Sequence, residues 1–375
     1  MKYFAAKELV ELGGIIYCKF PFLRIKKYDL VLVRTDRIGD YVIWHDTIAA
    51  YKQRYPNKKV LLICNDSILT LAREESFFTE ILCYNINKIK GSAKYAIGFI
   101  NTLKTIEAEI LINSIWERIW YADIFSMAIK AHHKIAIAPK KKTGKFVEYY
   151  NRNYDELIDC CGYVSEIEAD EGFAKKTIWQ EYRYGNYLLA VKADKISVDS
   201  PYAVISFSTS TVKKNWPIDS FSHVIDIIPS KYKIVLIGAG AYDEVCAKKI
   251  LEQVNSPDRI TNYVGKTTIP EMVSIISKAS FVLGNDSAAV HIASATNVPS
   301  IAILSGTHYK RFLPYPSNVN LKYSPRVVIN KMNCFNCDYH CIFPDEEPFE
   351  CIKRISVEAV EEEVRKMIDE IEKSN

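Results

Sequence analysis

Short apolar runs alternate with stretches of helical spacing along the first part of the chain. A continuous run of roughly four to eight apolar residues is typical of a buried strand, whereas apolar residues at every third or fourth position indicate a helix. Strands are therefore predicted at 28–34, 59–64, 109–114 and 133–138. A helix is predicted over 41–55, ending before Pro56, and 151–192 is predicted to be mostly helical.

A second series of the same kind follows. Its predicted strands cover 202–207, 233–238, 281–285 and 300–306, and its predicted helices cover 217–228, 243–254, 269–279 and 287–296. Strands that alternate with helices indicate parallel sheets. The predicted fold class is therefore α/β, with two Rossmann-like parallel sheets and a cleft between them, where a ligand site is expected.

The domain boundaries follow from these two series. Residues 1–185 are predicted to form the first Rossmann-like domain, and residues 186–350 the second. The remaining segment, 351–375, contains an amphipathic helix whose apolar face holds Val357, Val360, Val364, Met367, Ile368 and Ile371. We expect that helix to pack on a domain and to carry no chemistry.

Composition and charge narrow the function classes. A net charge of +4 over 375 residues gives no reason to expect nucleic-acid binding. No apolar run approaches the roughly 20 residues of a membrane-spanning helix, and the charged opening segment is not a signal peptide, so we expect a cytoplasmic protein. That segment ends in Phe20, Phe22, Arg24, Lys26 and Lys27. It favours either a helix packed on its own domain or a peripheral contact with the cytoplasmic face of the inner membrane.

Charged residues gather where the first predicted strand ends. Arg34 ends that strand, and Asp36, Arg37, Gly39 and Asp40 follow it. An Asp near a helix start is commonly a capping residue, so capping is one interpretation of Asp40. The crowding of charges favours another interpretation, because open α/β sheets bind ligands at the carboxyl ends of their strands.

A second polar corner follows the strand at 202–207. Ser208 and Thr209 begin a hydroxyl-rich loop, and Lys213 and Lys214 come before Pro217, which suits a first helical turn. Hydroxyl and ammonium groups can hold phosphate oxygens. The alternative is a solvated loop with two surface lysines.

The third corner is GNDSAAVH at 284–291, where an apolar strand runs into a helix of small residues. Asp286 is predicted to cap that helix. Ser287 and the first free amides of the helix favour a phosphate group. His291 lies one turn later on the same face as Ser287, and its alternative role is that of a satisfied, partly buried histidine. We interpret this corner as a nucleotide diphosphate site.

The order of these motifs resembles the bacterial heptosyltransferase family. The motifs are R-x-D-R-I-G-D at 34–40, K-x-W-P at 214–217, G-N-D-S-x-x-x-H at 284–291 and G-T-x-x-x-x-F-L-P at 306–314. The resemblance implies a glycosyltransferase of family 9 with the GT-B fold. It also implies an inverting, metal-independent transfer of a sugar, usually heptose from ADP-heptose, onto a lipopolysaccharide core or a related surface glycan.

The resemblance further implies residue roles. Asp40 matches the general base, Lys214 the lysine that binds the donor diphosphate, and Glu244 an acid that binds the ribose. The other donor-site candidates are Ser208, Thr209, Lys213, Asp286, Ser287, Ala288 and His291, and the acceptor-side candidates are Arg34, Arg37 and Gly39. Ala288 departs from the family's usual glycine, and its methyl group narrows the space beside the phosphates.

These roles agree with the chemistry of sugar transfer. A base must take the acceptor proton, and positive charge or amide dipoles must hold the departing diphosphate. The sequence has no Asp-x-Asp motif that would suggest a catalytic metal ion.

Four of the ten cysteines cluster near the end of the chain, at Cys334, Cys337, Cys341 and Cys351. Four thiols can bind Zn²⁺ tetrahedrally, although a zinc finger usually joins two closely spaced pairs. The cluster is therefore a candidate for a structural zinc site or a redox-sensitive pair, without a catalytic role. The other six, at 18, 64, 83, 160, 161 and 246, are expected to be reduced.

Two rival functions stay open. IGAGAYDE at 237–244 suggests a nicotinamide-dependent oxidoreductase, but the third glycine of the dinucleotide fingerprint is missing and the turn follows the second strand of its series. The other rival is a non-catalytic nucleotide-binding module.

Overall fold

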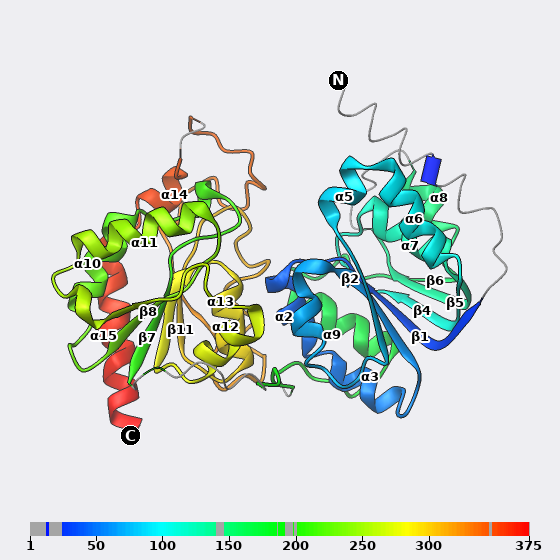
Figure 1. Cartoon of the computed structure of the whole chain (residues 1–375), viewed down its shortest axis with the longest axis horizontal. Helices are drawn as coiled ribbons and strands as arrows, with labels where there is room; N and C mark the ends of the chain where they lie inside the picture. The colour runs from blue at the N-terminus through cyan, green and yellow to red at the C-terminus, as the bar shows by residue number, and fades with distance from the viewer. Residues whose placement is uncertain are drawn as a thin grey trace. The chain divides into compact units, whose positions relative to one another are not determined.

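A computed structural model describes residues 13–14, 25–139, 146–185, 187–191, 198, 201–344 and 347–374. The chain divides into two compact units, Met1–Tyr182 and Arg183–Asn375 (Figure 1). The boundary predicted after residue 185 lies three residues into the second unit, which also includes the segment 351–375.

Unit 1 contains, among its described residues, a parallel sheet in the order β3-β2-β1-β4-β5-β6. The strands are β1 (Lys26–Arg34), β2 (Val60–Asn65), β3 (Glu80–Tyr84), β4 (Ile106–Asn113), β5 (Lys130–Ile137) and β6 (Glu156–Ile158). In the register of the central strands, Val31 lies beside Leu61 on one side and Leu111 on the other. The sequence pattern did not predict the two edge strands. Most of β3 is only half-buried, and β6 has three residues and lies within the stretch predicted to be helical.

Helices cover both faces of this sheet. They are α2 (Ile38–His45), α3 (Ile48–Arg54), η1 (Asp66–Ile68), α4 (Leu69–Ala72), α5 (Ile86–Gly91), α6 (Ala93–Leu103), α7 (Trp120–Ala128), α8 (Val147–Asn151) and α9 (Glu166–Thr177). Figure 1 shows α5, α6 and α7 on one face, and α2, α3 and α9 on the other. Val31 and Val33 pack with Phe99 and Phe125 in the core under α6 and α7, as the alternation of side chains along a strand requires.

Two of the predicted helices in unit 1 are wrong. The helix over 41–55 is broken, because α2 ends at His45 and α3 begins at Ile48. The Thr47 hydroxyl donates to the carbonyl of Trp44 at 2.7 Å, which competes with the regular helical hydrogen bonds. Within the described part of 151–192, the one helix longer than a single turn is α9, and it begins at a capping box formed by Ser165 and Glu168.

Unit 2 repeats the same topology. Its described strands form a parallel sheet in the order β12-β11-β10-β7-β8-β9. They are β7 (Tyr202–Ser206), β8 (Lys233–Leu236), β9 (Ile260–Asn262), β10 (Phe281–Asn285), β11 (Ser300–Ile303) and β12 (Arg326–Val328). In both units the first strand of the series therefore lies beside the fourth, which is the strand order of a doubly wound sheet.

The helices of unit 2 also form two layers. They are η2 (Val212–Lys214), α10 (Ile218–Ile227), α11 (Ala241–Gln253), η3 (Pro257–Arg259), α12 (Ile269–Ser277), α13 (Ala288–Ala295), α14 (Glu350–Lys353) and α15 (Val357–Ser374). Helix α10 packs against α11 and α15, whereas α12 packs against α13. The face of α15 that is buried in the core consists of Val360, Val364, Met367 and Ile368.

In the described part of the chain, no helix is both long enough and apolar enough to cross a bilayer. Phe20, Phe22 and Arg24, which belong to the segment expected to pack or to contact a membrane, lie outside the described residues. Lys26 and Lys27 open strand β1.

Candidate functional site

Each sheet has one position where neighbouring strands lead into connections that run in opposite directions. In unit 2 this position lies between β7 and β10, and in unit 1 between β1 and β4. The diverging connections leave the carboxyl edge of the sheet open, and open α/β sheets bind their ligands there. The three polar corners of the sequence lie at these two positions, because they follow β1, β7 and β10.

Asn285, the last residue of β10, joins the two corners of unit 2. Its side-chain amide donates to the carbonyl of Phe207 at 2.6 Å and accepts the backbone N–H of Trp216 at 3.0 Å. The Trp216 indole in turn donates to the carbonyl of Ile355 at 2.9 Å. Because Asn285 is fully buried with both polar groups satisfied, it holds the loop between β7 and α10 against the end of β10.

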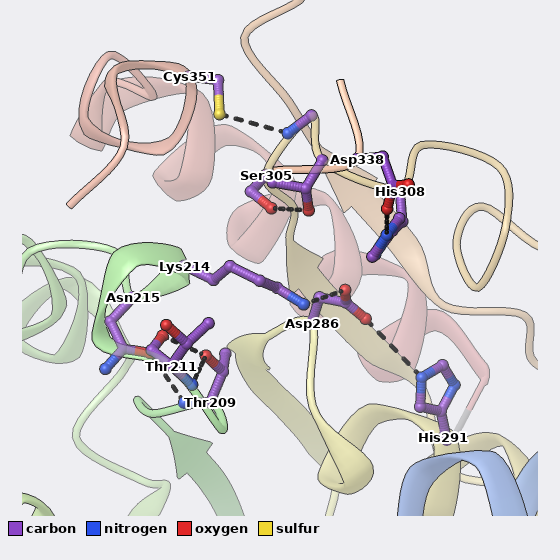
Figure 2. A network of polar contacts seen from close by, with 12 residues as sticks. Thr209, Thr211, Lys214, Asn215, Asp286, His291, Ser305, His308, Asp338 and Cys351 are labelled. Atoms are coloured by element: carbon purple, nitrogen blue, oxygen red, sulfur yellow. Dashed lines mark hydrogen bonds and ion pairs between the residues drawn. The ribbon is translucent and has the colours of Figure 1, made fainter. Parts of the chain in front are cut away.

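Lys214 and Asp286 form an ion pair between these two corners. The Lys214 Nζ lies 3.1 Å from the Asp286 Oδ2, and the side chains are 10% and 9% exposed. Figure 2 shows the two side chains pointing toward each other. Burial would raise the pKa of Asp286, but the Lys214 charge and then the nearby His291 outweigh it and hold that pKa below its usual value. Lys214 is therefore a buried, paired cation, and the interpretation of two surface lysines is wrong for it.

The prediction that Asp286 caps the following helix is wrong. Ser287 occupies the N-cap position of α13 and makes no side-chain capping bond within the described structure, while Ala288 is the first helical residue. The Ser287 Oγ lies 3.3 Å from the Oγ of Ser206 at the end of β7. Because Asp286 pairs with Lys214 instead, the first amides of α13 are candidates for binding an anionic group.

His291 lies one turn into α13, beside the ion pair. Its Nε2 is 3.8 Å from the Asp286 Oδ1, and its Nδ1 is 2.7 Å from the hydroxyl of Tyr315, whose ring stacks on the imidazole. Burial lowers the pKa of His291 to about 4, with Asp286 opposing the shift and Lys214 adding to it. The imidazole is therefore neutral at pH 7 and shares one hydrogen bond with Tyr315.

The other residues predicted in the second corner have separate partners. The Ser208 hydroxyl donates to Asp243 at 2.8 Å. The Thr209 hydroxyl donates to the Thr211 carbonyl at 2.8 Å within the loop. The Lys213 ammonium lies over the ring of Phe349, 5.7 Å from its centroid. Lys214 thus takes part in the ion-pair network, whereas Lys213 is directed to an aromatic ring.

The Gly238-Ala239-Gly240 turn holds a carboxylate of the chain itself. The Ala239 amide donates to Asp243 at 2.7 Å, and a Cβ at Gly238 would meet the same carboxylate at 2.5 Å. The pyrophosphate of a dinucleotide would have to bind at this turn, where the Asp243 carboxylate lies. The geometry therefore argues against the oxidoreductase interpretation. Glu244 lies exposed one residue further along α11, near Gly265 on the neighbouring loop.

Arg34 ends β1 at the corresponding position of unit 1. Its Nε donates to Asp36 at 2.6 Å, and its Nη1 donates to the carbonyl of Ser114, just beyond β4, at 2.8 Å. Asp170 lies 3.8 Å away, and the Trp44 ring lies beneath the guanidinium. Arg34 is 3% exposed. Its Nε and Nη1 donors bind within unit 1, and the acceptor-side role of Arg34 stays a prediction.

Asp40 is the third residue of α2. Arg37 occupies the N-cap position, so Asp40 is not the capping residue. Its carboxylate lies in the first helical turn, where the helix dipole favours negative charge. Arg37 is exposed, and Gly39 and Asp40 are half-buried.

Asp170, from α9, adds a further carboxyl to this corner. Burial raises the pKa of Asp170 well above its usual value; the Arg34 charge opposes this, and Glu166, Asp36 and Asp40 add to it.

Sequence reasoning missed Asn285, Tyr315 and Asp170 as parts of the two corners. Asn285 stands inside the quoted G-N-D-S motif, which was the available signal for it. Tyr315 lies in a loop without periodicity, and Asp170 lies in a helix far along the chain from Arg34. Their places depend on tertiary packing, for which the local pattern contains no signal.

A family model and several curated relatives match the chain. The model of glycosyltransferase family 9 (heptosyltransferase) matches residues 100–338. That range includes the corners at Lys214 and Asp286 and does not reach Asp40. Lipopolysaccharide heptosyltransferase 3 of Escherichia coli is 24% identical over 298 residues, which cover 75% of this chain and 84% of that protein.

Two solved structures have a similar fold. A glycosyl transferase of family 9 from Veillonella parvula DSM 2008 has a TM-score of 0.71 at 13% identity. The match covers 93% of this chain and 98% of the Veillonella chain. The E. coli heptosyltransferase WaaC, solved with ADP, has a TM-score of 0.70 at 14% identity. The match covers 91% of this chain and 100% of the WaaC chain.

Proposed function

The chain belongs to glycosyltransferase family 9, and on that premise we propose that it transfers heptose from ADP-heptose to a lipopolysaccharide core or a related surface glycan. It is a glycosyltransferase, and its fold class is the predicted one, α/β of the GT-B type with two parallel sheets. The name of the E. coli relative supports the acceptor class, and the ADP in the WaaC structure supports the nucleotide.

The observation that carries the proposal is the pair of Lys214 and Asp286 beside the N-terminus of α13. The diphosphate of the donor would lie at this corner, with its oxygens toward the Lys214 ammonium and the first amides of α13. Both groups favour negative charge. As the sugar leaves, charge develops on the β-phosphate, and prearranged donors stabilise it most in the transition state. We therefore propose that the Lys214 ammonium and these amides stabilise the leaving diphosphate, which is the role of Mg²⁺ in other transferases.

Asp40 is the general base of the proposed reaction. Its carboxylate takes the proton of an acceptor hydroxyl while that oxygen attacks the anomeric carbon. The bond from this carbon to the β-phosphate oxygen breaks, and ADP leaves with the electron pair. Attack from the face opposite to the leaving group inverts the anomeric configuration. Arg37, exposed next to this turn, is the cation proposed to meet anionic groups of the acceptor.

The test is the variant Asp40→Asn, which keeps the size of the side chain and removes its basicity. Turnover of ADP-heptose is expected to fall by about 10²- to 10⁴-fold, while ADP affinity, measured by calorimetry, stays unchanged. Asp29→Asn is the matched control, because Asp29 lies toward the other end of β1 and accepts the Lys59 amide there. The control is expected to keep full turnover.

Two further measurements separate the alternatives. Unchanged turnover in Asp40→Asn would remove this residue from the base role, and absence of transfer in the unsubstituted chain would favour a nucleotide-binding module. A thermal-shift panel of ADP-, GDP-, UDP- and dTDP-sugars identifies the donor, because a bound ligand raises stability by mass action. The largest shift is expected with ADP-heptose, and NMR of the product reports the anomeric configuration.

A further inference from the structure

A histidine and a carboxylate from two loops of unit 2 form a pair near the corner of Lys214 and Asp286. His308 lies in the loop after β11, and Asp338 lies in the loop between β12 and α14. The His308 Nε2 is 2.9 Å from the Asp338 Oδ1 (Figure 2). The pKa of Asp286, which burial would raise, is lowered mainly by Lys214 and to a smaller extent by His308. The imidazole is therefore close enough to act on the Asp286 carboxylate.

Backbone hydrogen bonds join the two loops at this point. The Asn336 N–H donates to the Gly306 carbonyl at 2.7 Å, and the Asp338 N–H donates to the Thr307 carbonyl at 3.1 Å. Asn336 and Asp338 have φ values of 65° and 49°, a left-handed conformation that Asn and Asp tolerate better than most residues. The place of Asp338 beside His308 is thus fixed by the main chain of both loops.

Aromatic rings hold the imidazole of His308 in position. The ring of Tyr339 meets it edge to face with the centroids 5.0 Å apart, and the ring of Phe312 does so at 6.1 Å. The His308 side chain is 18% exposed, and that of Asp338 is 61% exposed. Because the imidazole is already packed and paired with a carboxylate, a ligand binds it without first ordering a free side chain.

The pair offers hydrogen-bonding atoms that suit a hydroxyl group. Among the described residues, the Nδ1 of His308 has no hydrogen-bond partner, and it is not one of the buried polar atoms that lack one. Nδ1 accepts a hydrogen bond in the neutral imidazole whose Nε2–H faces Asp338, and donates one in the charged imidazole. A hydroxyl can serve as either partner. Two neighbouring hydroxyls, as on a sugar, match the pair better than a phosphate, which the Asp338 carboxylate would repel.

The pair is not part of a metal-ligand cluster. In the part of the chain that the structure describes, no group of three or more His, Cys, Asp or Glu side chains is placed to hold a metal ion. The zinc site predicted from the sequence stays a prediction, and its four cysteines are free thiols: Cys334, Cys337, Cys341 and Cys351.

The strand order of unit 2 places the pair at one end of the proposed donor site. Glu244, the residue predicted to bind the ribose, follows β8, and the corner of Lys214 lies between β7 and β10, the next strands of the sheet. His308 follows β11, which pairs with β10 on its other side. Neighbouring strands lie about 5 Å apart. A nucleotide sugar whose diphosphate lies at Lys214 and whose ribose lies toward β8 therefore extends its sugar toward β11.

We propose that His308 and Asp338 form the sugar subsite of the donor site and select the donor through hydrogen bonds to two neighbouring hydroxyls of its sugar. The Nδ1 of His308 binds one hydroxyl, and the Asp338 carboxylate accepts the other while it holds the imidazole in place. This subsite rests on the proposed function, and it adds the contacts that distinguish ADP-heptose from ADP.

The experiment compares ADP with intact ADP-heptose, each titrated by calorimetry in the absence of acceptor. In Asp338→Asn and in His308→Phe, affinity for ADP-heptose is expected to fall by about 3- to 30-fold, because each variant loses or weakens a hydrogen bond to a hydroxyl. Affinity for ADP should stay unchanged. Asn tolerates the left-handed backbone at position 338, and Phe keeps the aromatic packing at position 308. His340→Phe, at an exposed position of the same loop, is the control and should bind both compounds as the unsubstituted chain does.

Two results would overturn the subsite. Unchanged affinity for ADP-heptose in both variants would mean that the sugar does not contact the pair, and an equal loss of ADP affinity would mean that the nucleotide does. If His308→Phe does not fold, Asp338→Asn decides alone. An unsubstituted chain that binds neither compound would contradict the proposed transferase. A chain that binds ADP-heptose equally well with and without the substitutions would contradict the subsite only.

Discussion

The corners of the two units occupy the same place in the same topology, yet the cation of each corner has different surroundings. At the end of β1, the Arg34 guanidinium pairs with Asp36 and lies 3.8 Å from Asp170. In the loop after β7, the Lys214 ammonium pairs with Asp286 beside the first amides of α13. The scaffold provides an open edge in both units, and the side chains decide what each edge can do.

The difference lies in which groups surround each cation. Arg34 directs its donors to Asp36 and Ser114 and is 3% exposed, so its charge stabilises unit 1 and holds carboxylates in place. Lys214 donates to Asp286 at 3.1 Å, and its ammonium lies at the same corner as the α13 amides. We therefore expect changes at Arg34 to affect stability and changes at Lys214 to affect nucleotide binding.

The largest expected effect is that of Arg34→Met. Removing the guanidinium leaves Asp36 buried without its partner, which costs about 3–5 kcal/mol of unfolding free energy. Hydrogen exchange of peptides from β1 and β4 should therefore become faster, while peptides from β7 and β10 exchange as before. Arg54→Met, at an exposed position of α3, is the control. Faster exchange in unit 2 as well would mean that the two corners are not independent in stability.

Lys214→Met tests the other corner. Loss of the ammonium is expected to weaken ADP binding by about 2–4 kcal/mol, or roughly 30- to 1,000-fold, because a buried charge contact is lost. Calorimetric titration with ADP measures this. Lys213→Met should have a much smaller effect, since that side chain lies over Phe349. Equal ADP affinity in Lys214→Met and the unsubstituted chain would discard the phosphate role of Lys214.

The pH dependence of stability should also differ between the units. Burial lowers the pKa of His291 from its usual value near 6.5 to about 4 in the folded chain. The unfolded chain therefore binds the proton first, and the stability of unit 2 falls as the pH falls from about 6.5 to about 4. The full loss is about 3 kcal/mol, at about 1.4 kcal/mol per pKa unit.

The check is thermal unfolding as a function of pH. His291→Gln should reduce the loss of stability between pH 6.5 and 4, since it removes the titrating group. His223→Gln, at an exposed position of α10, should not change it. Identical pH profiles for the unsubstituted chain and His291→Gln would contradict the neutral, buried histidine.

These corners also show how far a sequence can predict a site. Continuous apolar runs predicted the buried strands of both sheets, because a parallel strand is covered on both faces. The edge strands β3, β6, β9 and β12 were not predicted. Strands β6, β9 and β12 have three residues each, and most of β3 is only half-buried. Lys214 and Asp286 were both named as candidates, but their pairing depends on the register of β7 beside β10. That register is a tertiary property, which a single local motif does not contain.

The smallest expected effect is that of Tyr315→Phe, which refines the description of the second corner. The variant keeps the ring that stacks on His291 and removes the hydroxyl that lies 2.7 Å from Nδ1. Loss of one such hydrogen bond to a buried group should cost about 1 kcal/mol. We expect a fall of that size in the stability of unit 2 and a severalfold loss of ADP affinity, measured by thermal unfolding and calorimetry, with Tyr323→Phe as a control on the same loop. If ADP affinity falls as far as in Lys214→Met, Tyr315 and His291 contact the nucleotide directly. If ADP affinity does not change, Tyr315 and His291 only pack against α13. In that case the Lys214–Asp286 ion pair and the α13 amides are sufficient for ADP binding.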